Sequence, residues 1–212
     1  MAENARDDTS LVDGYQAVTL ATQRGEVRCR YYAADETKRG VVWIGGVGGG
    51  WDTPARDLYP RLAAELTGEE VLGLRVRFRH PGEMEDCVFD VCAGLAYLQK
   101  RGAKKLAVVG HSFGGAVAIQ AAARMPAVTA VVALAPQSHG GDLAATLGPR
   151  CALLLVHGKD DEILPPTCSE HLHAIAVEPK KFLLFSGARH VLDEVADRVH
   201  REIRNWLLTY LE

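Results

Sequence analysis

The segment Gly-His-Ser-Phe-Gly at residues 110–114 constrains the fold of this chain more than any other part of the sequence. An apolar run at 106–109 precedes it, and a run of small and apolar residues follows it. The pattern Gly-x-Ser-x-Gly between a strand and a helix is typical of a sharp turn, the nucleophile elbow, which holds serine in a strained conformation. The two glycines let the strand and the helix pass without side chains between them. We therefore expect the Ser112 hydroxyl to stand exposed at one edge of a sheet.

Two later segments carry the groups that a reactive serine requires. A serine hydroxyl is a weak nucleophile near neutral pH, so Ser112 needs a histidine base and a carboxylate that orients the histidine. The apolar run 151–156 leads into an acidic turn at 157–165, and the run 181–185 leads into a glycine turn that ends at His190. The order serine, acid, histidine is the one expected after a nucleophile elbow.

Through these three segments the chain resembles the α/β-hydrolases, in particular the small lidless serine esterases and the dienelactone-hydrolase-like branch. The resemblance covers residues 18–211. The family's His-Gly-x-x-Asp-x-x-Val-Pro type of turn selects Asp161 rather than Asp160 as the acid, and its Gly-x-x-His turn selects His190. Dienelactone hydrolases proper have a cysteine where this chain has Ser112, so their specific activity is not the one expected here.

Acyl transfer also requires backbone N–H groups that point at the developing oxyanion. One donor is expected to be the amide of Phe113, the residue after the serine, and the other comes from a loop after an earlier strand. The apolar run 41–44 precedes a glycine-rich loop at 45–51, which fits this role. The family usually has His-Gly-x there and this chain has Gly-Gly-Val, so Val47 is the expected second donor.

The substrate site is expected to be open and shallow. The connection 136–151 is too short for the lid domain that many α/β-hydrolases insert at this point. The candidate walls of the site are Trp51, Phe113, His139 and Leu164, for each of which ordinary packing is the alternative. His111 and His157 are expected to pack or hydrogen-bond locally.

Three arginines alternate with apolar residues in the predicted strand 71–78 and just after it, at positions 75, 77 and 79. In one interpretation they pair with acids of the following helix. In the other, Arg79 holds an acidic substrate group through a forked contact. The sequence leaves both open.

The chain alternates between strand and helix patterns, which favours an α/β fold: a mostly parallel sheet with helices on both faces. The expected strands are 18–24, 27–33, 41–44, 71–78, 106–109, 128–134, 152–157 and 181–185, and the expected helices are 54–66, 83–99, 113–124, 166–175 and 192–211. The first two strands are expected to form an antiparallel hairpin.

Length and composition fit one domain over residues 1–212, with 1–12 as a flexible N-terminal segment. A net charge of −3 provides no cationic surface for nucleic acid or an anionic membrane, and no apolar run approaches a membrane span. The five cysteines are odd in number and contain no Cys-x-x-Cys pair, so no disulfide framework, metal or cofactor is expected. A cytoplasmic location is the expectation, and the oligomeric state stays open.

The resemblance implies a serine hydrolase that cleaves small carboxylic esters through an acyl-enzyme. Ser112 would attack the acyl carbon, His190 would transfer the proton, and Asp161 would orient the imidazole. A thioesterase or peptidase with the same triad is the alternative among enzymes. A catalytically silent relative that serves as a binding or scaffold protein is the alternative of another class.

Overall fold

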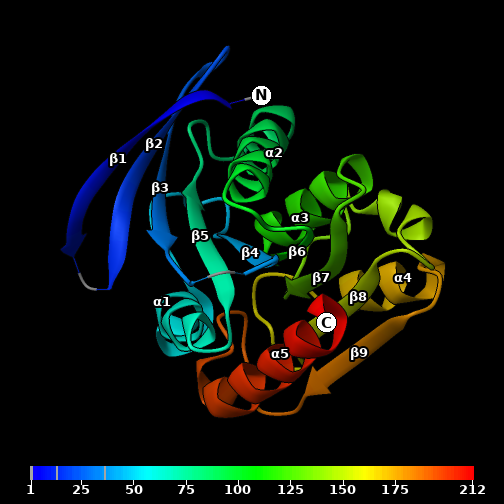
Figure 1. Cartoon of the computed structure of the whole chain (residues 1–212). Helices are drawn as coiled ribbons and strands as arrows, with labels where there is room; N and C mark the ends of the chain where they lie inside the picture. The colour runs from blue at the N-terminus through cyan, green and yellow to red at the C-terminus, as the bar shows by residue number, and fades with distance from the viewer. Residues whose placement is uncertain (1, 13, 36) are drawn as a thin grey trace.

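The computed structural model describes residues 2–12, 14–35 and 37–212, and the strands within these ranges form a single sheet (Figure 1). Its nine described strands lie in the order β1-β2-β3-β5-β4-β6-β7-β8-β9. The strands are β1 (Ala2–Val12), β2 (Tyr15–Thr22), β3 (Gly25–Tyr32), β4 (Arg39–Ile44), β5 (Val71–Arg77), β6 (Lys105–His111), β7 (Val128–Leu134), β8 (Ala152–Gly158) and β9 (Lys180–Phe185). The strands from β5 to β9 in this order pair in parallel, whereas β1, β2 and β3 pair antiparallel and β3 joins β5 antiparallel.

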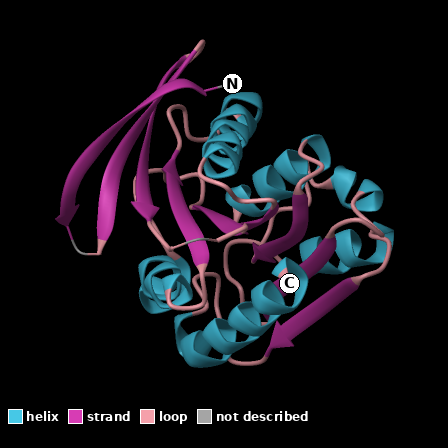
Figure 2. Cartoon of the chain, in the orientation of Figure 1, coloured by secondary structure: helices cyan, strands magenta, loops and turns pink. Residues whose placement is uncertain are grey.

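Helices cover both faces of the sheet (Figure 2). The helices are α1 (Pro54–Thr67), α2 (Met84–Lys100), α3 (Phe113–Arg124), α4 (Thr167–Ile175) and α5 (Ala196–Leu211), with short 3₁₀ helices η1 (Asp142–Thr146) and η2 (Asp193–Val195). Buried side chains of α2, α3 and α4 form one apolar cluster with the sheet, and those of α1 and α5 form another on the opposite face. The α/β-hydrolase fold expected from the sequence is confirmed in this arrangement.

The two ends of the chain differ from expectation. From residue 2 to residue 12 the segment expected to be flexible is strand β1, paired antiparallel with β2. Backbone groups at a sheet edge accept another strand whatever its side chains, so polar composition at 1–12 does not prevent pairing. At the other end, helix α5 begins at Ala196 instead of residue 192, because Leu192 is left-handed at φ 64° and the turn η2 follows it.

The connection between β7 and β8 holds only the short helix η1 within its described residues, so no lid domain is inserted there. In the part of the chain that the structure describes, no helix combines the length and the apolar character that crossing a bilayer requires.

Candidate active site

The turn between β6 and α3 has the geometry expected from its glycines. Ser112 has φ 56° and ψ −123°, a strained conformation for a residue with a side chain. A Cβ atom added at Gly110 would lie 2.1 Å from the carbonyl oxygen of Gly114, and one added at Gly114 would lie 2.1 Å from that of Gly45. These close approaches explain why both positions require glycine.

The loops after β8 and β9 bring Asp161 and His190 together. Nδ1 of His190 lies 2.7 Å from Oδ2 of Asp161. The other oxygen of Asp161 accepts hydrogen bonds of 2.8 Å from the main-chain N–H groups of Ile163 and Leu164. Burial by itself raises the pKa of Asp161, but these hydrogen bonds and the imidazole outweigh burial and hold the pKa below its usual value. The carboxylate is therefore ionised and fixed in place near neutral pH.

The neighbouring acid has a different partner. Oδ2 of Asp160 accepts a hydrogen bond of 3.0 Å from the main-chain N–H of Gly187. Gly187 lies in the turn that presents His190, so Asp160 holds the backbone of this turn while Asp161 holds the imidazole. This arrangement agrees with the choice of Asp161 over Asp160 as the orienting acid.

His111 ties the segment that carries His190 to the turn at Ser112. Its Nε2 lies 3.0 Å from the carbonyl oxygen of His190, and the two rings have centroids 4.8 Å apart. Because a carbonyl oxygen only accepts, Nε2 of His111 carries the proton. Burial lowers the pKa of His111 to about 4, so the ring is neutral near pH 7. The local hydrogen bond expected for this residue is confirmed, with His190 as its partner.

His157 contacts the same carboxylate oxygen of Asp161 as His190 does. Its Nδ1 lies 2.7 Å from Oγ of Ser169, and its Nε2 lies 3.0 Å from the carbonyl oxygen of Leu164 and 3.1 Å from Oδ2 of Asp161. The carbonyl partner requires a proton on Nε2, so Nδ1 accepts from the serine hydroxyl. Burial is the main cause that lowers the pKa of His157. The structural role expected for His157 is confirmed, although its contact with Asp161 was not foreseen.

The loop after β4 is held by Asp52, which sequence reasoning did not single out. Oδ2 of Asp52 accepts a hydrogen bond of 2.9 Å from the main-chain N–H of Gly46. A Cβ atom at Gly45 would overlap the same carboxylate, at 1.8 Å from Oδ1. Within the described residues, the N–H groups of Val47 and Phe113 have no hydrogen-bond partner. The sequence contained one signal for this contact, because Asp52 is an acid directly after the glycine-rich loop 45–51.

The candidate walls of the site have varied surroundings. The ring of Trp51 stacks on the guanidinium of Arg30 at 4.3 Å, and its carbonyl oxygen accepts a hydrogen bond of 2.7 Å from Arg75. His139 is exposed. Leu164 is half-buried. Its main-chain N–H donates to Asp161, and its carbonyl oxygen accepts from Nε2 of His157. Trp51 is therefore engaged with arginines of the sheet, and Leu164 is the wall candidate that directly contacts the Asp161 region.

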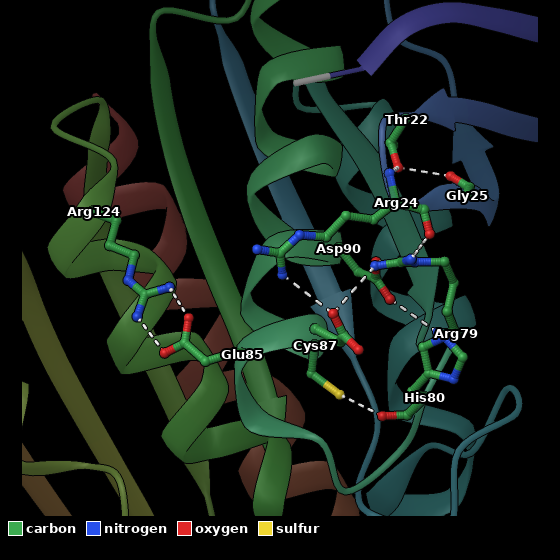
Figure 3. A network of polar contacts seen from close by, with 10 residues as sticks. Thr22, Arg24, Gly25, Arg79, His80, Glu85, Cys87, Asp90 and Arg124 are labelled. Atoms are coloured by element: carbon green, nitrogen blue, oxygen red, sulfur yellow. Dashed lines mark hydrogen bonds and ion pairs between the residues drawn. The ribbon is translucent and has the colours of Figure 1, made fainter.

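Arg79 is engaged by α2 (Figure 3). Its Nε donates a hydrogen bond of 2.6 Å to Oδ1 of Asp90, and its main-chain N–H donates one of 2.9 Å to Oδ2. Another nitrogen of its guanidinium donates to the carbonyl oxygen of Arg24. The pairing of Arg79 with an acid of the following helix is confirmed. Two of its guanidinium nitrogens already have partners in the fold, which favours the first interpretation over the forked contact with an acidic substrate group.

The sheet order, the strained serine turn and the helices on both faces define the chain as an α/β-hydrolase. Residues 50–201 match the model of the dienelactone hydrolase family. The chain belongs to this family and is a hydrolase of the α/β fold.

Solved structures with the same fold cover nearly the whole chain. A dienelactone hydrolase from Anabaena variabilis superposes with a TM-score of 0.77 at 18% identity, over 93% of this chain and 98% of that one. Est1E from Butyrivibrio proteoclasticus has a TM-score of 0.77 at 17% identity, over 92% and 98%. The esterase domain of a Rhodothermus marinus protein has a TM-score of 0.76 at 20% identity, over 93% and 99%. At these identities the likeness concerns the fold.

Among curated relatives, the uncharacterized protein YfhR of Escherichia coli O157:H7 is 37% identical over 83 residues. The matched segment is 37% of this chain and 28% of the relative. The chain therefore matches less than a third of the length of this relative.

Proposed function

We propose that the chain is a carboxylesterase-type serine hydrolase with Ser112, His190 and Asp161 as its catalytic triad. The observation that carries the proposal is the 2.7 Å contact between His190 and the buried Asp161. His111, which directly precedes Ser112, hydrogen-bonds the main chain of the same histidine. A serine in a strained turn beside an oriented imidazole fits nucleophilic catalysis.

In the proposed mechanism Oγ of Ser112 attacks the acyl carbon of the ester. Nε2 of His190 takes the hydroxyl proton and gives it to the leaving alkoxide, and the acyl group stays on the serine. Asp161 remains ionised, fixes the tautomer of His190 through Nδ1, and stabilises the imidazolium. Water then attacks the acyl-enzyme with His190 as the base. This sequence returns the serine unchanged and releases the acid.

The tetrahedral intermediates carry a negative charge on the former carbonyl oxygen. The N–H groups of Val47 and Phe113 are the proposed donors to this oxygen. The two N–H groups have no other hydrogen-bond partner within the described residues, and this supports the assignment. A donor that is already bonded in the ground state would have to break that bond to stabilise the oxyanion in the transition state. Asp52 contributes indirectly, since it fixes Gly46 beside Val47.

Exposed apolar side chains near these groups favour small apolar acyl or alcohol groups. Val47 is 58% exposed, Ile163 is 64% exposed and Val191 is 42% exposed. Each lies at, or within two residues of, one of the proposed catalytic positions. Because these side chains stay largely in water, a substrate methylene that packs against them gains only part of the roughly 0.8 kcal/mol that full burial of a methylene gives.

A chain-length series of p-nitrophenyl esters tests this proposal, with Ser112→Ala as the control. We expect kcat/KM to be highest for acetyl to butyryl esters and to fall by decanoyl, with no rise in activity above the solubility limit of the substrate. Ser112→Ala should lower turnover by a factor on the order of 10⁴. A maximum at long chains would contradict the open site, and strong turnover by Ser112→Ala would contradict the nucleophile. Thioester and peptide substrates in the same assay separate the thioesterase and peptidase alternatives.

A further inference from the structure

The three alternating arginines of β5 and the residues just after it have three different surroundings. Arg75 is 4% exposed and donates to the carbonyl oxygen of Trp51. Arg79 is engaged by Asp90. Arg77 is exposed, and among residues 14–35 and 37–212, whose side chains the structure describes, no carboxylate lies within ion-pair distance of it. Its charge is therefore not explained by the fold.

A second arginine lies directly across from Arg77. In the antiparallel pairing of β3 with β5, Arg28 is the register partner of Arg77. Directly opposed residues in such a pair have Cβ atoms about 4.5–5.5 Å apart, and like charges at these positions destabilise the pair. Arg28 is also exposed and makes no ion pair with an acid among residues 14–35 and 37–212, whose side chains the structure describes. Two exposed arginine side chains thus leave the sheet from directly opposed positions.

These two arginines line a cavity of about 360 Å³, which we call the arginine pocket. Its ionisable lining consists of Arg24, Arg28, Arg77, Arg79 and His80 with one carboxylate, Glu26. The charges of two of these arginines are already matched from α2: Asp86 lies 3.2 Å from Arg24, and Asp90 lies 2.6 Å from Arg79. Figure 3 shows this matched side of the pocket, where the Arg79 guanidinium lies between the main chain of Arg24 and the Asp90 carboxylate. Arg28 and Arg77 carry the remaining positive charge, and with the carboxylate of Glu26 counted against them the pocket keeps one excess positive charge.

The pocket opens at the same edge of the sheet as the proposed catalytic loops. It lies where the β2–β3 turn meets the carboxyl end of β5. Phe78, which also lines it, contacts Phe113 edge-on with ring centroids 6.1 Å apart. In the order β3-β5-β4-β6, two strand spacings of about 4.8 Å separate β5 from β6 and three separate β3 from β6, so the two arginines lie on strands about 10–14 Å from the strand that precedes Ser112.

We propose that the arginine pocket binds a phosphate group through the guanidinium groups of Arg28 and Arg77. One guanidinium fork satisfies both oxygens of a carboxylate, whereas a phosphate group has enough oxygens to accept from two forks at once. The phosphate also supplies the negative charge that relieves the repulsion between the two arginines. It is carried by a substrate whose ester reaches Ser112, or it binds as a free anion; the site is the same in both cases.

The first test measures inorganic phosphate binding by isothermal titration at constant ionic strength, so that screening does not vary. We expect saturable binding that Arg28→Gln and Arg77→Gln each weaken at least about tenfold, a loss typical of charge-assisted hydrogen bonds. Arg201→Gln, an exposed arginine of α5, is the matched control and should bind like the parent. Absence of saturable binding, or an equal loss in the control, would overturn the proposal.

Thermal unfolding shows whether the variants are folded. Without phosphate, Arg77→Gln should unfold at the same temperature as the parent or a higher one, because the like-charge pair is gone. Phosphate should raise the unfolding temperature of the parent and leave that of the variant unchanged. A variant stabilised by phosphate as much as the parent would contradict the site.

A substrate pair separates the two sources of phosphate, and this arm rests on the proposed esterase function. We compare 2-(4-acetoxyphenyl)ethyl phosphate with its neutral alcohol. At least about tenfold higher kcat/KM for the phosphate, lost in Arg28→Gln, assigns the phosphate to the substrate. Equal kcat/KM for the two substrates, with phosphate binding retained, would show that the pocket binds phosphate as a free anion. Ser112→Ala should bind phosphate like the parent, so failure of the esterase proposal would leave the binding result intact.

Discussion

Two buried carboxylates at the same edge of the sheet have different partners. The Asp90 side chain is fully buried and lies 2.6 Å from the guanidinium of Arg79, and the Asp161 side chain is fully buried and lies 2.7 Å from the imidazole of His190. Arginine does not release its proton near neutral pH, whereas histidine does. The first pair therefore holds β5 against α2, and the second is suited to move a proton. The partner, more than the burial of the acid, separates the structural pair from the pair that we propose to be catalytic.

The backbone contacts of the two acids reinforce this difference. Burial raises the pKa of Asp90 and remains dominant there despite the hydrogen bonds from Arg79. In Asp161 the hydrogen bonds from Leu164, His190 and Ile163 outweigh burial, and the pKa is lowered. The proposed catalytic acid is thus kept ionised largely by main-chain donors that do not depend on a permanent positive charge.

The largest expected effect comes from the acid of the catalytic pair. Asp161→Asn should lower kcat on p-nitrophenyl butyrate by roughly 10²–10⁴, because the amide favours the wrong tautomer of His190. Asp160→Asn is the matched control and should cost less than about tenfold, since the Asp160 side chain accepts its hydrogen bond from the main chain of Gly187 and none from His190. The reverse order of effects would show that Asp160 is the orienting acid.

The structural pair should respond in the opposite way. Asp90→Asn leaves the Arg79 guanidinium without a buried counter-charge, and we expect it to lower the free energy of unfolding by about 3 kcal/mol in urea titrations. The folded variant should keep kcat within about tenfold of the parent. Asp86→Asn removes a more exposed partner of Arg24 and should cost less than about 1 kcal/mol. A loss of activity without a loss of stability in Asp90→Asn would contradict the structural role of the Asp90–Arg79 pair.

A smaller effect concerns His111, the buried neutral histidine between the two halves of the site. Its pKa is about 4 in the folded state, below the value of about 6.5 in an unfolded chain. Below pH 6.5 the unfolded chain therefore binds a proton that the folded protein does not, so stability falls as the pH falls. This residue should account for about 2 kcal/mol of the loss between pH 7.5 and pH 5.

His111→Gln keeps an N–H donor for the main chain of His190 but does not titrate. Urea titrations at the two pH values should show a smaller loss for this variant than for the parent. An identical loss would mean that other groups account for the pH dependence.

Local signals in the sequence predicted most of the fold and the central contact of the site. The serine turn and the helix after it were placed correctly because the steric need for glycine on both sides of the serine is visible within five consecutive residues. The Asp161–His190 contact followed from turn spacing at two strand ends. The pairing of Arg79 with an acid of the next helix was one of two open interpretations. The partner of His111 lies 79 residues away, at His190, and depends on which strands are neighbours, a property of the whole sheet. Strand β1 was missed because edge pairing uses the backbone and leaves no apolar pattern to read.

The central claim is that Ser112 is the nucleophile activated by His190. Intact mass spectrometry after treatment with a fluorophosphonate probe tests it most directly. We predict a single covalent adduct on the parent protein, none on Ser112→Ala, and strongly slowed labelling of His190→Ala. An adduct of equal yield on Ser112→Ala, or no adduct on the folded parent, would contradict the assignment.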